Sequence, residues 1–210
     1  LQMLKARGKT VMLDICDHVI ALPHLSRLYA GLLPMADAIS TPTEALAEVL
    51  SAHVDCPVHV IPDAIEGRRG GAIDGVASDD GPLRLLWFGR SQNLAPLIDH
   101  LAEITPRALG LPVVLEVMSN QGPSLDLLVS RIPDGLTVTV TPWTTDGLDD
   151  ALARAELVLL PTDQDPTRRV KSANRLERAL WAGRLPVAMP SPVTEPYADS
   201  AIVEPCLGDG

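Results

Sequence analysis

Polar and apolar residues along this chain follow a rhythm that predicts parallel strands alternating with helices. Short apolar runs are typical of strands that helices cover on both faces of a parallel sheet. In the first 65 residues the predicted strands are 10–15, 38–40 and 58–61, and the predicted helices are 25–33 and 41–50. The second helix has a start signal, in which Thr41 is the N-cap, Pro42 the first helical residue and Glu44 the end of a capping box.

The composition changes between Glu66 and Pro82, where apolar residues become sparse and glycines mix with arginine and aspartate. This mixture is typical of an inter-domain linker. Beyond it the predicted strands are 83–88, 113–118, 136–140, 157–160 and 186–189, and the predicted helices are 94–104, 125–130, 148–153 and 172–182. Such alternation forms right-handed βαβ units and a parallel sheet. We therefore expect an α/β protein with one domain over 1–66, a linker over 67–82 and a second domain over 83–210.

Composition narrows the classes of function. The 210 residues carry a formal net charge of −10, so general binding to nucleic acid or to anionic membranes is not expected. No apolar stretch is long enough to cross a membrane. The histidines show no metal-ligand spacing, so no metal site is predicted. The three cysteines lie far apart in the sequence, which favours free thiols and a cytoplasmic location.

The two ends of the sequence suggest a piece of a longer protein. The first residue is Leu1 rather than methionine, and no signal peptide precedes the first predicted strand. The last residues, Gly208-Asp209-Gly210, read as a turn. We therefore expect the first of the two domains to be incomplete.

A candidate anion site lies where the last predicted helix opens, at Lys171-Ser172-Ala173-Asn174-Arg175. A helix N-terminus at the carboxyl end of a parallel strand is a ready site for a phosphate group. Ser172 has an ordinary alternative role as the N-cap. A lysine at this end of the helix dipole costs about 0.3–1 kcal/mol, so Lys171 favours a bound anion that offsets the cost.

Three further candidates follow predicted strands of the second domain. Arg90 comes after the first strand, and Gly89 before it allows a ligand close to the main chain. A surface arginine after a turn is the plain alternative. Trp143 suits stacking beside a base or packing, and Asp163 suits binding sugar hydroxyls or capping a turn. The chain has no G-x-G-x-x-G motif, no P-loop and no nucleophile elbow.

Five segments, in this order, resemble group-1 (family 4-like) GT-B glycosyltransferases, which are retaining enzymes that use nucleotide-sugars. The segments are 36–42, 60–65, 85–90, 155–161 and 171–187. The resemblance implies two Rossmann-like domains, an incomplete acceptor-side domain and a donor-binding domain with a doubly wound, mostly parallel sheet. It also implies transfer of a sugar from a nucleotide-diphosphate donor to an unknown acceptor (a sugar, a lipid-linked sugar or a protein), with no cofactor.

The resemblance further implies which residues hold the donor diphosphate. In the family this group is bound by an arginine after the first strand, which matches Arg90, and by a lysine. Ser91-Gln92-Asn93 stands where that lysine usually lies. Lys171 is predicted to take its role, with Ser172 and Asn174 beside it.

The paired acidic residues of the family, its E-x7-E motif, are altered in this chain. Lys171 and Arg178 stand in their places, and Glu177 is one position away. Trp143, Asp163 and Glu177 are the predicted contacts to the donor base or sugar. The altered motif keeps two alternatives open, a nucleotide-sugar epimerase of similar build and a module that binds a sugar nucleotide or a partner without catalysis. The 210-residue chain by itself is expected to bind nucleoside diphosphate without turnover.

Overall fold

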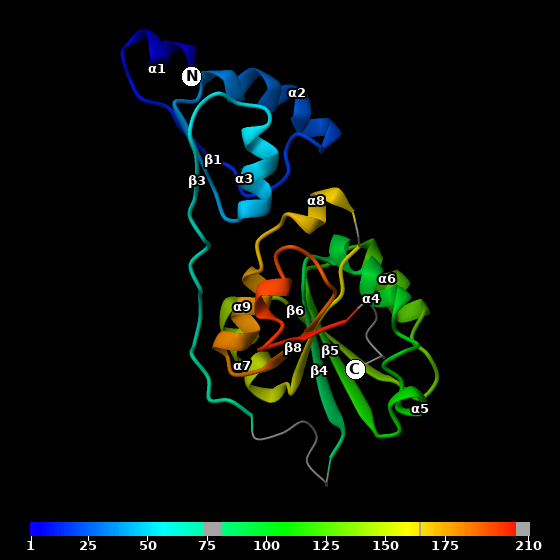
Figure 1. Ribbon diagram of the computed structural model, residues 1–210. Helices are drawn as coiled ribbons and strands as arrows, with labels where there is room; N and C mark the ends of the chain where they lie inside the picture. Colours follow the sequence, from blue (N-terminus) through cyan, green and yellow to red (C-terminus); the bar gives the residue numbers. More distant parts are fainter. Residues whose placement is uncertain (74–80, 164, 205–210) are drawn as a thin grey trace. The chain divides into compact units, whose positions relative to one another are not determined.

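A computed structural model describes residues 1–73, 81–163 and 165–204, and these form two compact units (Figure 1). The first unit consists of residues 1–64, 165–173 and 191–193, and the remaining described residues form the second. Each unit has its own parallel sheet. The assignment of the two units as acceptor-side and donor-side domains stays a prediction.

The first unit contains a three-stranded parallel sheet and several short helices, of which α3 packs against the sheet. Its strands β1 (Met12–Asp14), β2 (Ala38–Thr41) and β3 (Val58–Val60) lie in that order. Its helices are α1 (Gln2–Ala6), α2 (Pro23–Leu32), η1 (Leu33–Met35), α3 (Glu44–Ser51) and α8 (Pro166–Arg169). Ile15, Ile39, Leu46 and Leu50 are buried in its core together with Val170, which comes from the distant segment after α8.

The prediction for the start of α3 is wrong by two residues. Thr43 is the N-cap, and its hydroxyl accepts a hydrogen bond from Leu46 N at 3.1 Å. Thr41 still belongs to β2, where its carbonyl accepts from Ile61 N at 2.9 Å. Pro42 therefore lies before the helix. Both threonines fit a capping pattern, and the pairing of β2 with β3 decides between them.

The second unit is built on a six-stranded parallel sheet. Its strands are β4 (Leu83–Gly89), β5 (Val113–Ser119), β6 (Thr137–Pro142), β7 (Leu157–Leu160), β8 (Leu185–Ala188) and β9 (Ile202–Val203). Their order is β6-β5-β4-β7-β8-β9, and all pairs are parallel. Counted within the unit, this is the 3-2-1-4-5-6 order of a doubly wound Rossmann sheet. The predicted α/β class and doubly wound sheet are confirmed, and the two-residue strand β9 is an addition.

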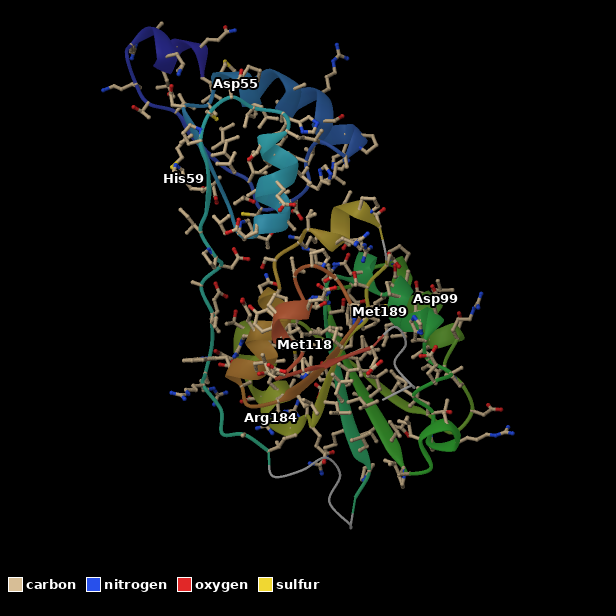
Figure 2. The ribbon with its side chains drawn as sticks, in the orientation of Figure 1. Asp55, His59, Asp99, Met118, Arg184 and Met189 are labelled. Carbon is tan, nitrogen blue, oxygen red and sulfur yellow. The ribbon has the colours of Figure 1, made fainter. Side chains whose placement is uncertain are left out.

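Helices connect these strands and cover the sheet (Figure 1). They are α4 (Ala95–Asp99), α5 (Pro106–Leu109), α6 (Pro123–Ser130), α7 (Thr145–Arg154) and α9 (Asn174–Trp181), with the 3-10 turns η2 (Ser91–Asn93) and η3 (Glu195–Tyr197). The main core packs Trp87 of β4 against Leu97 of α4 and Leu128 of α6. Met118 of β5 and Met189 after β8 are also buried (Figure 2). Burial on both faces explains why the central strands read as continuous apolar runs.

The helix predicted over 94–104 is wrong in its second half. α4 ends at Asp99, and the chain turns before α5 begins at Pro106. Leu101 and Ile104 lie in the turn and are nevertheless buried in the core. The apolar spacing predicts correctly which residues are buried, but it does not show whether one helix carries them all.

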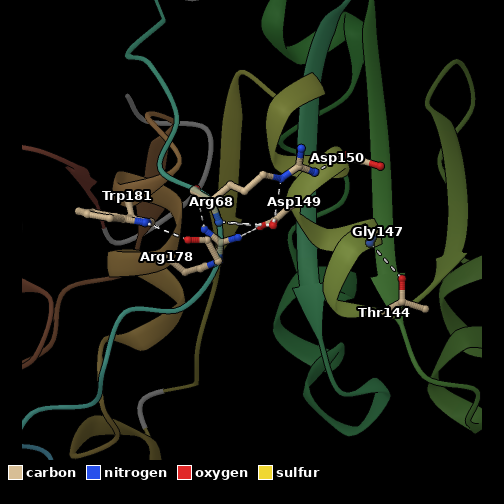
Figure 3. Close-up of polar contacts among 8 residues, drawn as sticks. Arg68, Thr144, Gly147, Asp149, Asp150, Arg178 and Trp181 are labelled. Carbon is tan, nitrogen blue, oxygen red and sulfur yellow. Dashed lines mark hydrogen bonds and ion pairs between the residues drawn. The ribbon is translucent and has the colours of Figure 1, made fainter.

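Residues 67–73 of the predicted linker pack onto α7 and α9 of the second unit. Arg68 donates through Nε to Asp149 at 3.2 Å and through Nη2 to Asp150 at 2.6 Å (Figure 3). Arg178 of α9 pairs with the same Asp149 and donates from Nη1 to the carbonyl of Arg68 at 3.3 Å. We call these four residues the Arg68 cluster.

Main-chain contacts hold the same segment. Trp181 donates from Nε1 to Gly67 O at 3.1 Å, and its own carbonyl accepts from Gly70 N at 3.0 Å. Gly67 has a φ of 83°, and a Cβ there would overlap the Arg178 guanidinium. This part of the predicted linker is therefore fixed to the second unit, and residues 74–80 lie outside the described part of the chain.

Candidate functional site at the carboxyl edge of the second sheet

The strand order of the second sheet creates a topological switch point between β4 and β7. From β4 the chain first builds β5 and β6 on one side, and then β7, β8 and β9 on the other. In doubly wound sheets, ligands bind in the crevice outside the carboxyl ends of the strands at this point. We call the residues that end and follow β4 and β7 the switch-point edge. It is the candidate site.

The carbonyl groups at the end of β4 are both occupied. Arg175 of α9 donates from Nη1 to Phe88 O at 3.3 Å. Ser119 of β5 donates from Oγ to Gly89 O at 2.8 Å. An ideal Cβ on Gly89 would lie only 3.3 Å from Arg175 Nη1 and 3.2 Å from Trp87 Cη2. The missing side chain thus allows a guanidinium to lie against the main chain at this edge.

Arg90 follows directly, exposed and with extended main chain at φ −73° and ψ 143°. The next residue, Ser91, is buried, and its N–H donates to Asn120 Oδ1 at 3.0 Å. Asn120 also donates from Nδ2 to Ser91 Oγ at 3.4 Å, which joins the loops after β4 and β5. Sequence reasoning missed Ser119 and Asn120, whose only signal was their place at the end of an apolar strand.

Lys171 and Ser172 belong to the first unit. The prediction that the last helix opens at Lys171 is wrong, because α9 begins at Asn174. Lys171 Nζ pairs with Asp17 Oδ1 at 2.8 Å, and Ser172 Oγ donates to Asp63 Oδ2 at 2.5 Å. Acidic groups of the first unit thus hold Lys171 and Ser172. A role for either residue at a donor diphosphate stays a prediction.

Asn174 is exposed as the first residue of α9, and Glu177 lies one turn later. The hydroxyl of Tyr197 in η3 donates to Glu177 Oε1. Burial, followed by the Glu177 carboxylate, raises the pKa of Tyr197 to about 12. The phenol therefore keeps its proton at neutral pH and orients the Glu177 carboxylate. Sequence reasoning missed Tyr197, because the contact joins residues 20 positions apart.

Trp143 and Asp163 follow β6 and β7, as predicted from the strand ends. The Trp143 side chain is 49% exposed, and its main-chain N–H donates to Ser119 O at 3.1 Å. β5 separates β6 from β4, so Trp143 follows a strand that lies about 10 Å from β4. Contact of either residue with a donor base or sugar stays a prediction.

Arg178, which stands in an acidic position of the resembled family, lies in the Arg68 cluster. The residue is 8% exposed, and burial lowers the pKa of its guanidinium. Its partners are Asp149 and the carbonyl of Arg68 (Figure 3). The side chain at this position therefore serves packing of α9 against α7.

A cavity of about 350 Å³ lies over the middle of β4, β5 and β6 beside α7, away from the switch-point edge. Three of its polar lining side chains pair with one another. Glu116 accepts from Thr141 Oγ1 at 3.1 Å and from Arg154 Nη2 at 3.0 Å. We place the candidate site at the strand ends instead, where the main-chain geometry suits a ligand.

Within residues 1–73, 81–163 and 165–204, no three His, Cys, Asp or Glu side chains are grouped as metal ligands would be. Across the same described ranges, no helix has the length and apolar character that a membrane crossing requires. Cys16 and Cys56 are free thiols, and burial together with the Asp14 carboxylate raises the pKa of Cys16. Cys206 lies outside the described residues.

No family model and no curated protein matches this sequence, but solved structures match its fold. TarM is 14% identical with a TM-score of 0.65, over 89% of this chain and 37% of that one. The pneumococcal O-GlcNAc transferase GtfA, in complex with UDP and GlcNAc, is 12% identical with a TM-score of 0.62, over 91% and 40%. A UDP-forming α,α-trehalose-phosphate synthase from Burkholderia vietnamiensis is 10% identical with a TM-score of 0.68, over 97% and 58%.

The chain thus spans between about a third and three fifths of the length of these three proteins. At such low sequence identities the likeness shows the fold. The fold predicted from the sequence, that of GT-B glycosyltransferases with Rossmann-like parallel sheets, is confirmed.

Proposed function

We propose that the second unit binds the diphosphate of a nucleotide-sugar at the switch-point edge, and that the protein is a retaining glycosyltransferase that moves the sugar to an acceptor. One observation carries the proposal. Arg90 leaves β4 at the point where a doubly wound sheet binds its ligand, in a fold shared with glycosyltransferases.

The proposed sugar transfer needs positive charge beside the leaving diphosphate more than it needs a side chain that bonds covalently to the sugar. When the bond between sugar and diphosphate breaks, negative charge grows on the leaving phosphate oxygens. A guanidinium fixed beside them stabilises that charge and so lowers the barrier. Arg90 is the residue proposed for this role, and Asn174 on α9 is proposed as a neutral hydrogen-bond donor to the same group.

Uridine diphosphate is the natural first probe. One structural neighbour was solved with UDP and GlcNAc, and another is named as UDP-forming. Glu177, oriented by Tyr197, suits the hydroxyl groups of a ribose or a donor sugar, because an ionised carboxylate accepts hydrogen bonds only. Trp143 and Asp163 are proposed as further contacts to the base or sugar.

Calorimetric titration with UDP and with uridine tests the proposal. A charge-assisted hydrogen bond to phosphate contributes about 1.5–3 kcal/mol, so Arg90→Ala is expected to weaken UDP binding about 10- to 150-fold. Uridine binding should be unchanged. Arg107→Ala is the matched control, because Arg107 is an exposed arginine of the same unit in α5, before β5 rather than after a strand. If wild type and Arg90→Ala bind UDP equally, the site is misplaced.

One observation favours a second function, a binding module without catalysis. Arg178 fills an acidic position of the resembled family and is buried against Asp149. Release of UDP from a UDP-sugar by the full-length protein would establish an enzyme. Tight UDP binding by the full-length protein without any release or transfer would establish the module, and interconversion of donor sugars would establish an epimerase.

A further inference from the structure

We propose that Arg175, on the first turn of α9, supplies the second positive charge of the donor diphosphate site. This inference rests on the proposed function and sharpens it. The sequence pattern places that charge on Lys171, whereas the geometry points to a residue four positions later.

The position of Arg175 is set by two elements. α9 connects β7 to β8, so its first turn starts from the β7 side of the switch point. The Nη1 atom of Arg175 nevertheless reaches Phe88 O, at the end of β4, at 3.3 Å. Arg90 leaves the same strand two residues later. The guanidinium of Arg175 therefore lies at the switch point itself, against a carbonyl two residues before Arg90, the arginine proposed to bind the diphosphate.

The main chain at this point is prepared for an anion. A carbonyl oxygen carries partial negative charge and repels phosphate when it faces one. Here Phe88 O accepts from Arg175, and Gly89 O accepts from Ser119 at 2.8 Å. Gly89 has no side chain to separate the guanidinium from the strand, since a Cβ would come within 3.3 Å of Nη1. The end of β4 therefore presents donors and positive charge.

Lys171 has a different setting. Its ammonium pairs with Asp17 at 2.8 Å within the first unit, and that carboxylate offsets its charge. It also comes before α9 in the chain, because the helix begins only at Asn174. The absence of a lysine in Ser91-Gln92-Asn93 is thus compensated by an arginine from another element.

The competing explanation is a purely structural role for Arg175, as a hydrogen-bond donor to Phe88 O. The two explanations differ in whether the positive charge of the side chain is needed. Arg175→Gln keeps an N–H donor but loses the charge. Arg175→Lys keeps the charge but loses the planar fork. If the charge binds phosphate, Gln should weaken binding of UDP and of inorganic pyrophosphate about 10- to 150-fold, while Lys should retain most of it. Uridine binding and the melting temperature should change little in either variant.

The experiment is calorimetric titration of wild type, Arg175→Gln, Arg175→Lys and Lys171→Ala with UDP, pyrophosphate and uridine. Lys171→Ala is expected to bind all three ligands within about twofold of wild type. Unchanged UDP binding by Arg175→Gln, or a large loss in Lys171→Ala, would overturn the inference and leave the proposed function standing. A wild-type protein that binds neither UDP nor pyrophosphate would overturn both.

Discussion

The buried pair of Asp149 and Arg178 offers a sharp test of how the second unit is held together. Both side chains are 10% exposed, and Asp149 also accepts from Arg68 (Figure 3). We consider two single replacements, Arg178→Met and Asp149→Leu. Each removes one partner from the pair, and each inserts an apolar side chain of moderate size into the same space.

The two replacements should differ in cost. Breaking a buried ion pair costs about 3–5 kcal/mol, because the remaining charge is left without its partner away from water. Arg178→Met should fall near the lower end, at about 3 kcal/mol, because Arg68 still donates to Asp149 from Nε and from its main-chain N–H. Asp149→Leu should fall near the upper end, at about 5 kcal/mol, because it leaves the buried Arg178 guanidinium unpaired. For a chain of this size, the melting temperature should drop by about 6–12 °C and about 10–20 °C, respectively.

The double variant Arg178→Met/Asp149→Leu makes the test decisive. An apolar pair carries no desolvation cost, so the double variant should be more stable than Asp149→Leu alone. Asp150→Ala is the matched control. It removes an exposed partner of Arg68, 61% accessible, and should cost less than about 1 kcal/mol. Chemical denaturation of the four variants measures these values. If the double variant shows the sum of the two single losses, Asp149 and Arg178 do not act as a buried pair.

Two further predictions concern single hydrogen bonds. Thr43→Ala should destabilise the protein by about 1–2 kcal/mol, because the Thr43 hydroxyl caps α3 and also donates to Val170 O at 2.8 Å. Thr41→Ala should cost less, because the buried Thr41 hydroxyl has no hydrogen-bond partner in the described residues. Thermal denaturation of the two variants compares these losses of stability. Tyr197→Phe should abolish the phenolate absorbance step near pH 12, and a step unchanged in the variant would contradict the contact of Tyr197 with Glu177. A raised pKa stabilises the folded state below the ordinary tyrosine pKa of about 10. The contribution of Tyr197 to stability should therefore be full at neutral pH and disappear as the pH rises from about 10 to about 12.

The second sheet was predictable because its strands are buried on both faces. Runs such as Leu157–Leu160 have no polar position to obscure them, and helices of ordinary length separate them. The parallel direction followed from that alternation. The order of the strands did not follow from it, since both sides of β4 are open to the next strand. The resemblance to GT-B enzymes supplied the doubly wound arrangement.

Features that depend on contacts between distant segments were not predictable. Val170 fills the core of the first unit although it follows strands of the second in sequence, and Thr43 donates to its carbonyl across 127 positions. Lys171, the next residue, lies before the helix that its sequence pattern suggested, because α9 begins at Asn174. A local pattern reports the propensity of a few residues and carries no information about contacts with a distant core.

Position 178 shows why a resemblance in sequence must be read together with the contacts it makes in space. The exchange of an acidic residue for Arg178, seen alone, suggests a lost ligand contact. In the structure the arginine is matched by Asp149 on α7 and by a segment after residue 66 that carries Arg68. A buried guanidinium is tolerated only with such partners. The same reasoning applies at the switch-point edge, where Ser91-Gln92-Asn93 stands in the place of a lysine and Arg175 brings a guanidinium from α9. At position 178 a neighbour in space balances the introduced charge, and at the switch-point edge a neighbour supplies the missing one. A substitution of charge in the E-x7-E region is therefore compatible with the proposed diphosphate site.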